Sequence, residues 1–128
     1  MNDFHSDDNT PVARLRQAVA DFARQRDWGR FHTPKNLAMS LAIEAAELME
    51  HFQWLTPEQS DAVARDAAKK QAVAEELADV LCYAFALANR LEIDVASTVA
   101  HKLEKNAEKY PVEKYRGYFG PDDPALES

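Results

Sequence analysis

The stretch VAEELADVLCYAFALANRL, residues 73–91, decides the fold, because it lacks glycine and proline and is apolar on nearly every side of a helix. A helix that is apolar all round is buried all round. One small bundle rarely buries a helix so completely. We therefore infer that the chain forms a homo-oligomer, a dimer or a tetramer, packed through this region. A central helix in a compact monomer is the alternative.

Outward from this stretch, three threonine–proline pairs predict helix starts. Threonine caps a helix and proline suits its first position, as in Thr10-Pro11, Thr33-Pro34 and Thr56-Pro57. Gln59 adds the second half of a capping box, Asp94 marks a fourth start, and Pro111 ends the last helix. The predicted helices cover about residues 11–25, 34–53, 57–90 with a break near Lys69-Lys70, and 95–109.

The chain is expected to be all-α. Its 128 residues contain three glycines, with none between Gly29 and Gly117, and this favours helices over a turn-rich β fold. Four helices with short connections indicate a four-helix bundle. The expected organisation is a disordered segment over 1–9, one domain over 10–112 and an irregular tail over 113–128.

Composition limits the classes of partner. The net charge of −7 argues against nucleic acid or an acidic membrane as the main partner. No apolar run is long enough to span a membrane, and residues 1–9 lack the apolar stretch of a signal peptide. The single cysteine, Cys82, allows no intrachain disulfide and is expected to be a small buried side chain. We therefore expect a cytoplasmic protein.

Two pairs of acids stand out by their position. Glu44 and Glu47 are three residues apart, as are Glu76 and Asp79, so each pair shares one helix face. At about 100° per residue, both pairs lie in or beside the apolar stripe of their helix, on the same rotational side. Two antiparallel helices would bring all four carboxylates to one rim of the core.

Four partly buried carboxylates require compensating positive charge. A cluster of oxygen ligands suits Mg²⁺, with Mn²⁺ as an alternative, rather than Zn²⁺. A solvated helix face is the usual explanation for either pair alone, and the two pairs together favour the metal site. A di-iron bundle fits poorly, because its Glu-x-x-His spacing is absent.

The acidic pattern Glu44-x-x-Glu47 and Glu76-x-x-Asp79 resembles the motif of the all-α nucleoside triphosphate pyrophosphohydrolases, the MazG-like superfamily. The resemblance covers about residues 12–112 and is strongest to the dCTP pyrophosphatase branch. Its further elements are Arg26-Asp27-Trp28, Phe31-His32, Pro34, Asn36-Leu37, Phe52-Gln53-Trp54, Tyr83, Lys102, Asn106 and Tyr110-Pro111.

The resemblance implies Mg²⁺-dependent hydrolysis of a dNTP, with dCTP or a modified dCTP favoured, to dNMP and diphosphate. The four acids would bind the metal, and Glu47 would activate the attacking water. The nucleotide would contact six further residues. Trp28 and Trp54 would stack on the base, His32 would bond its edge, Tyr83 would pack under the deoxyribose, and Lys102 and Asn106 would meet phosphate or sugar.

Two alternatives stay open. One is a non-catalytic helical interaction module, and the other is a related dUTP-type or phosphoribosyl pyrophosphohydrolase on the same bundle. The chain also departs from the dCTP pyrophosphatase branch at Val19, where that branch has a histidine. The change removes a polar group from the expected nucleotide pocket and leaves strict dCTP preference open.

Overall fold

The computed structural model describes residues 5–117, and within that range the chain contains helices and turns but no strand. The helices are α1 (Val12–Gln25), α2 (Pro34–Glu50), α3 (Pro57–Ala62), the 3-10 turn η1 (Val63–Arg65), α4 (Ala67–Arg90), α5 (Val95–Lys109) and α6 (Val112–Tyr115). The predicted all-α class is confirmed. None of the described helices is long and apolar enough to cross a membrane.

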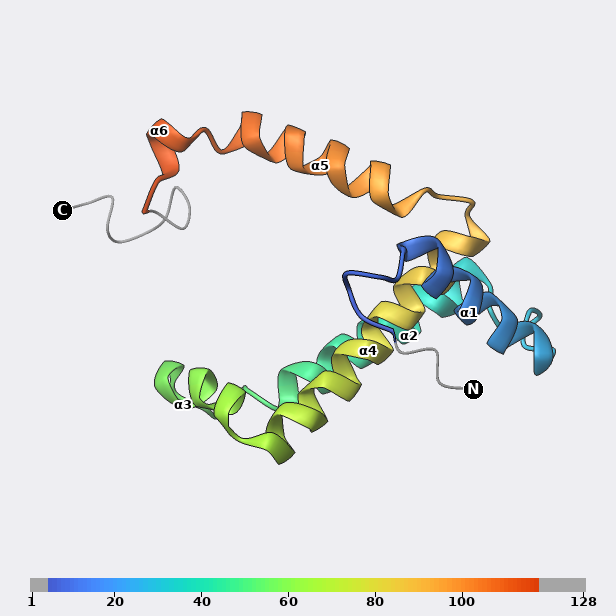
Figure 1. The fold of residues 1–128 in the computed structure, drawn as a ribbon, viewed down its shortest axis with the longest axis horizontal. Coiled ribbons are helices and arrows are strands. Elements are labelled where there is room, and N and C mark those ends of the chain that lie inside the picture. Colours follow the sequence, from blue (N-terminus) through green and yellow to red (C-terminus); the bar gives the residue numbers. More distant parts are fainter. Residues whose placement is uncertain (1–4, 118–128) are drawn as a thin grey trace. The chain divides into compact units, whose positions relative to one another are not determined.

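The chain divides into two compact units, residues 1–93 and 94–128. In the first unit, α4 runs back alongside α2, and α1 packs on α4 (Figure 1). The fourth predicted helix corresponds to α5 and belongs to the second unit. The four-helix bundle and the single domain over 10–112 therefore stay predictions.

The predicted caps at Thr33 and Thr56 are confirmed. The Thr33 hydroxyl accepts a hydrogen bond from the Asn36 backbone at 3.2 Å. Thr56 and Gln59 form the full capping box. Asp94 caps α5 by accepting from the Ser97 backbone at 3.1 Å. These bonds satisfy helix N–H groups that have no partner inside the helix.

Two predicted boundaries are wrong. Thr10 does not cap α1, because its hydroxyl donates instead to Asn9 Oδ1 at 2.6 Å and the helix begins one residue after Pro11. The third helical region is interrupted at Asp66 and not at Lys69-Lys70. The Asp66 side chain accepts from the Lys69 backbone at 3.1 Å, so Lys69 lies in the first turn of α4.

The ends of the chain fall partly outside the described residues. Of the segment predicted to be disordered, residues 1–4 are not described, and Asn9 closes a turn by accepting from the Ser6 backbone at 2.9 Å. Of the tail predicted to be irregular, residues 118–128 are not described, and α6 forms one short helix within the described part.

The core of the described chain is thin. Leu37 on α2, Val63 on η1 and Ala88 on α4 are its buried apolar residues, and Leu37 is 1% exposed. By contrast, Leu77, Leu81 and several other large apolar side chains are exposed. The first unit therefore presents apolar surface that its own described residues do not cover.

Both α1 and α4 end in a left-handed residue that is not glycine. At the end of α4, Glu92 has φ 54°, and the Ile93 N–H bonds to the Ala88 carbonyl at 2.9 Å. At the end of α1, Asp27 has φ 52°. This Schellman closure usually uses glycine, because a Cβ is strained there.

Replacing Glu92 by Gly is expected to raise the free energy of unfolding by about 1 kcal/mol, because the substitution removes that strain. Chemical denaturation of the full chain measures the change. Asp27→Gly is the matched control and should gain less, because aspartate tolerates the left-handed region better than glutamate. A loss of stability in Glu92→Gly would contradict this account of the helix end.

Candidate metal and nucleotide site

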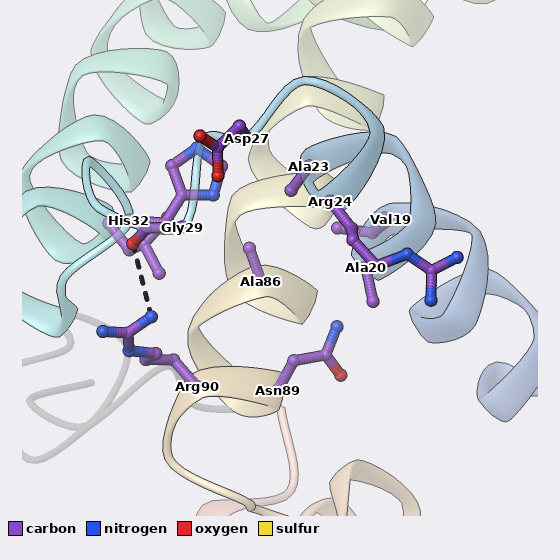
Figure 2. A pocket seen from close by; sticks show the side chains of 11 residues that line it. Val19, Ala20, Ala23, Arg24, Asp27, Gly29, His32, Ala86, Asn89 and Arg90 are labelled. Carbon is purple, nitrogen blue, oxygen red and sulfur yellow. Dashed lines mark hydrogen bonds between the residues drawn. The ribbon is translucent and has the colours of Figure 1, made fainter.

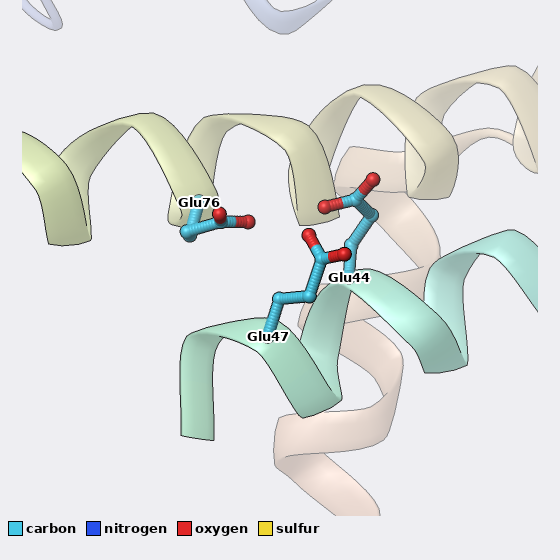
Figure 3. Close-up of side chains that lie close together, drawn as sticks. All are labelled: Glu44, Glu47 and Glu76. Carbon is cyan, nitrogen blue, oxygen red and sulfur yellow. The ribbon is translucent and has the colours of Figure 1, made fainter. Parts of the chain in front are cut away.

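Three of the four predicted acids converge. Glu44 and Glu47 extend from α2 and Glu76 from α4, and the three side chains point toward one another (Figure 3). Each offers a carboxylate oxygen within 4.8 Å of the others. The convergence follows from the antiparallel packing of two helices whose acids flank their apolar stripes.

The environment of these oxygens is unfavourable for free carboxylates. All three side chains are half-buried. Glu44 Oε2 and Glu76 Oε2 are shielded from solvent, and neither has a hydrogen-bond partner among the described residues. A buried acceptor without a partner costs about 1–3 kcal/mol, and more if it is charged. Two such oxygens on facing helices are a feature that a bound cation would satisfy.

The cluster also changes the protonation of one member. The pKa of Glu44 is raised from its usual 4.5 to about 7, first because a protonated Glu44 donates a hydrogen bond to Glu47, and then by burial. The charge of Glu47, a hydrogen bond of the protonated group with Glu76 and the charge of Asp79 raise the pKa further. Near neutral pH, a proton therefore offsets part of the repulsion among the acids.

Asp79 lies outside the group of three. Its side chain is exposed on α4, one turn after Glu76, and its charge still reaches Glu44. Its role as a fourth metal ligand stays a prediction. The donor set that does converge consists of carboxylate oxygens alone, which fits a hard divalent cation such as Mg²⁺ or Mn²⁺.

An apolar pocket of about 550 Å³ lies between α1, α4 and the loop that follows α1. Its lining includes Phe22, Trp28, His32, Asp79 and Tyr83. The ring of Trp28 meets that of Phe22 edge to face at 5.7 Å and lies 6.0 Å from that of His32. The structure therefore brings three of the six predicted nucleotide contacts together beside Asp79.

The lining of this pocket does not include the other three predicted contacts. Trp54 follows α2 and is 86% exposed. Lys102 and Asn106 are on α5, in the second unit. Lys102 lines a separate hollow on that helix together with His101 and Lys105. The roles of these residues with nucleotide stay predictions.

A second pocket, of about 350 Å³, adjoins the first and shares Val19, His32 and Ala86 with it (Figure 2). Its polar lining includes Asn89 and Arg90, which sequence reasoning did not single out. No periodic or motif signal marks them, because their partners lie far away in the sequence.

Cys82 corrects a further expectation. Its side chain is exposed rather than buried and lies in the lining of the apolar pocket. Partial burial and the charge of Asp79 raise the pKa of its thiol, so the thiolate is disfavoured.

Comparison with known proteins agrees with this geometry. The model of the MazG-like family matches residues 39–118. Bovine dCTP pyrophosphatase 1 is 37% identical over 89% of this chain, and the rat protein of the same name is 41% identical over 80%. The chain spans 78% of the bovine protein and 61% of the rat protein.

A solved structure is similar as well. The crystal structure of a pyrophosphatase from Archaeoglobus fulgidus is 38% identical and superposes with a TM-score of 0.69, covering 87% of this chain and 98% of that one. The all-helical fold, the converging carboxylates and the family match lead to one conclusion: the chain belongs to the MazG-like family.

Proposed function

We propose that the chain is a divalent-metal-dependent pyrophosphohydrolase that converts a dNTP, with dCTP or a modified dCTP favoured, to dNMP and diphosphate. The observation that carries the proposal is the set of three converging carboxylates with two unsatisfied buried oxygens, together with an aromatic pocket lined by Asp79, one turn after Glu76 on α4. The names of the bovine and rat relatives support dCTP as the favoured substrate.

The proposed metal ligands are Glu44, Glu47, Glu76 and Asp79, with Mg²⁺ as the metal and Mn²⁺ as a substitute. A bound dication would neutralise charge on the phosphate oxygens as the reaction proceeds. The chain's own contribution is to hold the acids at a fixed spacing on two packed helices. Their negative charge without a cation would repel a triphosphate.

Glu47 is the proposed general base. Its carboxylate oxygen lies within 4.8 Å of those of Glu44 and Glu76, so a water held by the cluster would have a proton acceptor within reach. The water oxygen bonds to the α-phosphorus, the bond from that phosphorus to the bridging oxygen breaks, and diphosphate leaves. The water proton passes to the Glu47 carboxylate.

The aromatic pocket is the proposed base and sugar site. Trp28 offers a stacking face, which is worth about 1–3 kcal/mol per base. His32 supplies a polar edge, and Tyr83 lies one helical turn after Asp79, where a deoxyribose would pack. Trp54, Lys102 and Asn106 complete the proposed contacts.

Two further parts of the proposal concern the location of the protein and its oligomeric state. Nucleoside triphosphates are kept in the cytoplasm, so we place the protein there. We also propose that the chain works as a homo-oligomer, a dimer or a tetramer, because Leu77 and Leu81 on α4 and Leu91 directly after it are each nearly half exposed.

Replacing Glu76 by Gln is expected to reduce diphosphate release from dNTPs in Mg²⁺ by about 100-fold or more, because a metal ligand loses its charge. Detection of diphosphate across a panel of dNTPs measures the loss. Glu75→Gln is the matched control, because Glu75 is exposed on the same turn and bonds only locally to Gln71 at 3.3 Å. Equal activity of the two variants would refute Glu76 as a metal ligand, whereas no diphosphate release by the unmutated chain in Mg²⁺ would favour a non-catalytic interaction module.

The stability of the metal-free protein is expected to fall as pH rises from about 5 to about 8. Over that range the folded chain keeps a proton on Glu44 that the unfolded chain has lost, so deprotonation favours unfolding. Mg²⁺ should raise the melting temperature more at pH 8 than at about pH 5.5, where the proton competes. Thermal melts in EDTA and in Mg²⁺ measure both effects. Glu44→Gln should flatten the dependence in EDTA, and an unchanged slope would refute this assignment.

Light scattering of the purified chain is expected to give a mass of two or four copies, because α4 exposes apolar side chains that a partner would cover. A monomer at all concentrations, with full activity, would rule out the oligomer.

A further inference from the structure

The loop of residues 26–33 carries two proposed base contacts, Trp28 and His32. Hydrogen bonds to α1, α2 and α4 hold this loop in place. The Trp28 N–H bonds to the Ala23 carbonyl at 3.0 Å, which closes α1. The Asn36 side chain donates to the Phe31 carbonyl at 3.1 Å. These bonds fix the two ends of the loop to α1 and α2.

The middle of the loop is held from α4. Arg90 Nη1 donates to the Gly29 carbonyl at 3.3 Å, across a sequence separation of 61 residues (Figure 2). Arg90 is the last residue of α4, the helix that also carries Glu76 and Asp79. The bond therefore connects the loop directly to the helix that bears part of the proposed metal site.

The neighbouring residue ties α1 to the same turn. Asn89 Oδ1 accepts from Arg16 Nε at 3.0 Å, and Asn89 Nδ2 donates to the Arg16 carbonyl at 3.0 Å. With α1 fixed in this way, the Arg90 bond is a direct side-chain link from α4 to the middle of the loop.

The helix between the two sites acts as a rigid spacer. Glu76 and Arg90 are about 21 Å apart along α4 at 1.5 Å per residue. A nucleotide with its phosphates at the acids would have its base in the pocket that Trp28 and His32 line. A loop held from the same helix keeps a constant distance from the acids. If the bound substrate is displaced by about 1 Å from its reactive position, the reaction rate can fall by about 100-fold.

We propose that Arg90 is a positioning residue for base discrimination: through the Gly29 carbonyl it sets Trp28 and His32 at the correct distance from the metal-binding acids. The proposal rests on the proposed function, because it concerns recognition at that same site. Arg90 itself touches neither the base nor the phosphates in this role.

The test compares Arg90→Met with Arg24→Met. Arg24 and Arg90 both line the pocket of about 350 Å³, and both carry a positive charge. The Arg24 side chain, however, pairs with Asp21 on the surface of α1 at 2.9 Å. Both variants thus lose one positive charge at the same rim, and only Arg90→Met loses the bond to the loop. Steady-state kinetics with a panel of dNTPs in Mg²⁺ gives kcat and KM for each.

Arg90→Met is expected to raise KM for the preferred dNTP by about 3- to 10-fold, with a smaller change in kcat, because one hydrogen bond is lost. The discrimination ratio, which is kcat/KM for the preferred dNTP divided by kcat/KM for another dNTP, should fall. A merely destabilised variant loses activity toward all dNTPs alike and keeps this ratio. Arg24→Met should also keep the wild-type ratio. Arg90→Lys, which retains a hydrogen-bond donor, should restore part of the ratio that Arg90→Met loses.

Hydrogen exchange provides a readout that needs no activity. The amides of residues 28–32 should exchange faster in Arg90→Met than in Arg24→Met, because the loop is released. Unchanged exchange and an unchanged ratio would overturn the positioning role while leaving the proposed function intact. A wild-type chain that releases no diphosphate from any dNTP would instead overturn the proposed function, and the role of Arg90 with it.

Discussion

Repulsion among closely spaced carboxylates is the constraint on which the site depends. Glu44, Glu47 and Glu76 place oxygens within 4.8 Å of one another on half-buried helix faces. Water does not reach two of these oxygens, so a proton or a cation must compensate them. The raised pKa of Glu44 has related causes, because a hydrogen bond to Glu47 and burial favour its protonated form and the charge of Glu47 adds to them. A divalent cation performs this compensation better than a proton, because it serves several carboxylates at once.

Helix α4 connects the parts of the molecule that the proposed reaction needs. Near its middle it carries Glu76 and Asp79, and further along it lines the apolar pocket through Tyr83. Its last turn holds α1 and the loop through Asn89 and Arg90. The proposed metal ligands Glu76 and Asp79 and the proposed sugar contact Tyr83 therefore lie on one continuous helix, which fixes their spacing along its axis.

Local features of the fold were predictable from sequence, and of the distant features only those that follow from helical periodicity were. The caps at Thr33, Thr56 and Asp94 are hydrogen bonds within three residues, so the sequence contains both partners. The predicted cap at Thr10 was wrong for an equally local reason, because the Thr10 hydroxyl donates its hydrogen bond to the Asn9 side chain instead.

The convergence of Glu44 with Glu76 followed from helical periodicity, which records which face an acid occupies. Periodicity does not record which loop lies over a helix end. The bond of Arg90 to Gly29 was therefore not readable from sequence, nor was the separation of Trp28, in the pocket, from the exposed Trp54.

The acceptor in the Arg90 bond is a main-chain carbonyl, and this has an evolutionary consequence. Every amino acid supplies that oxygen, so exchanging the side chains of Arg30 or Phe31 leaves the anchor in place. Mutation can thus vary the chemistry that the loop presents without relocating it. The loop side chains that would contact the ligand can therefore change while the bond that holds the loop stays the same. Related enzymes can diversify by altering a few loop residues.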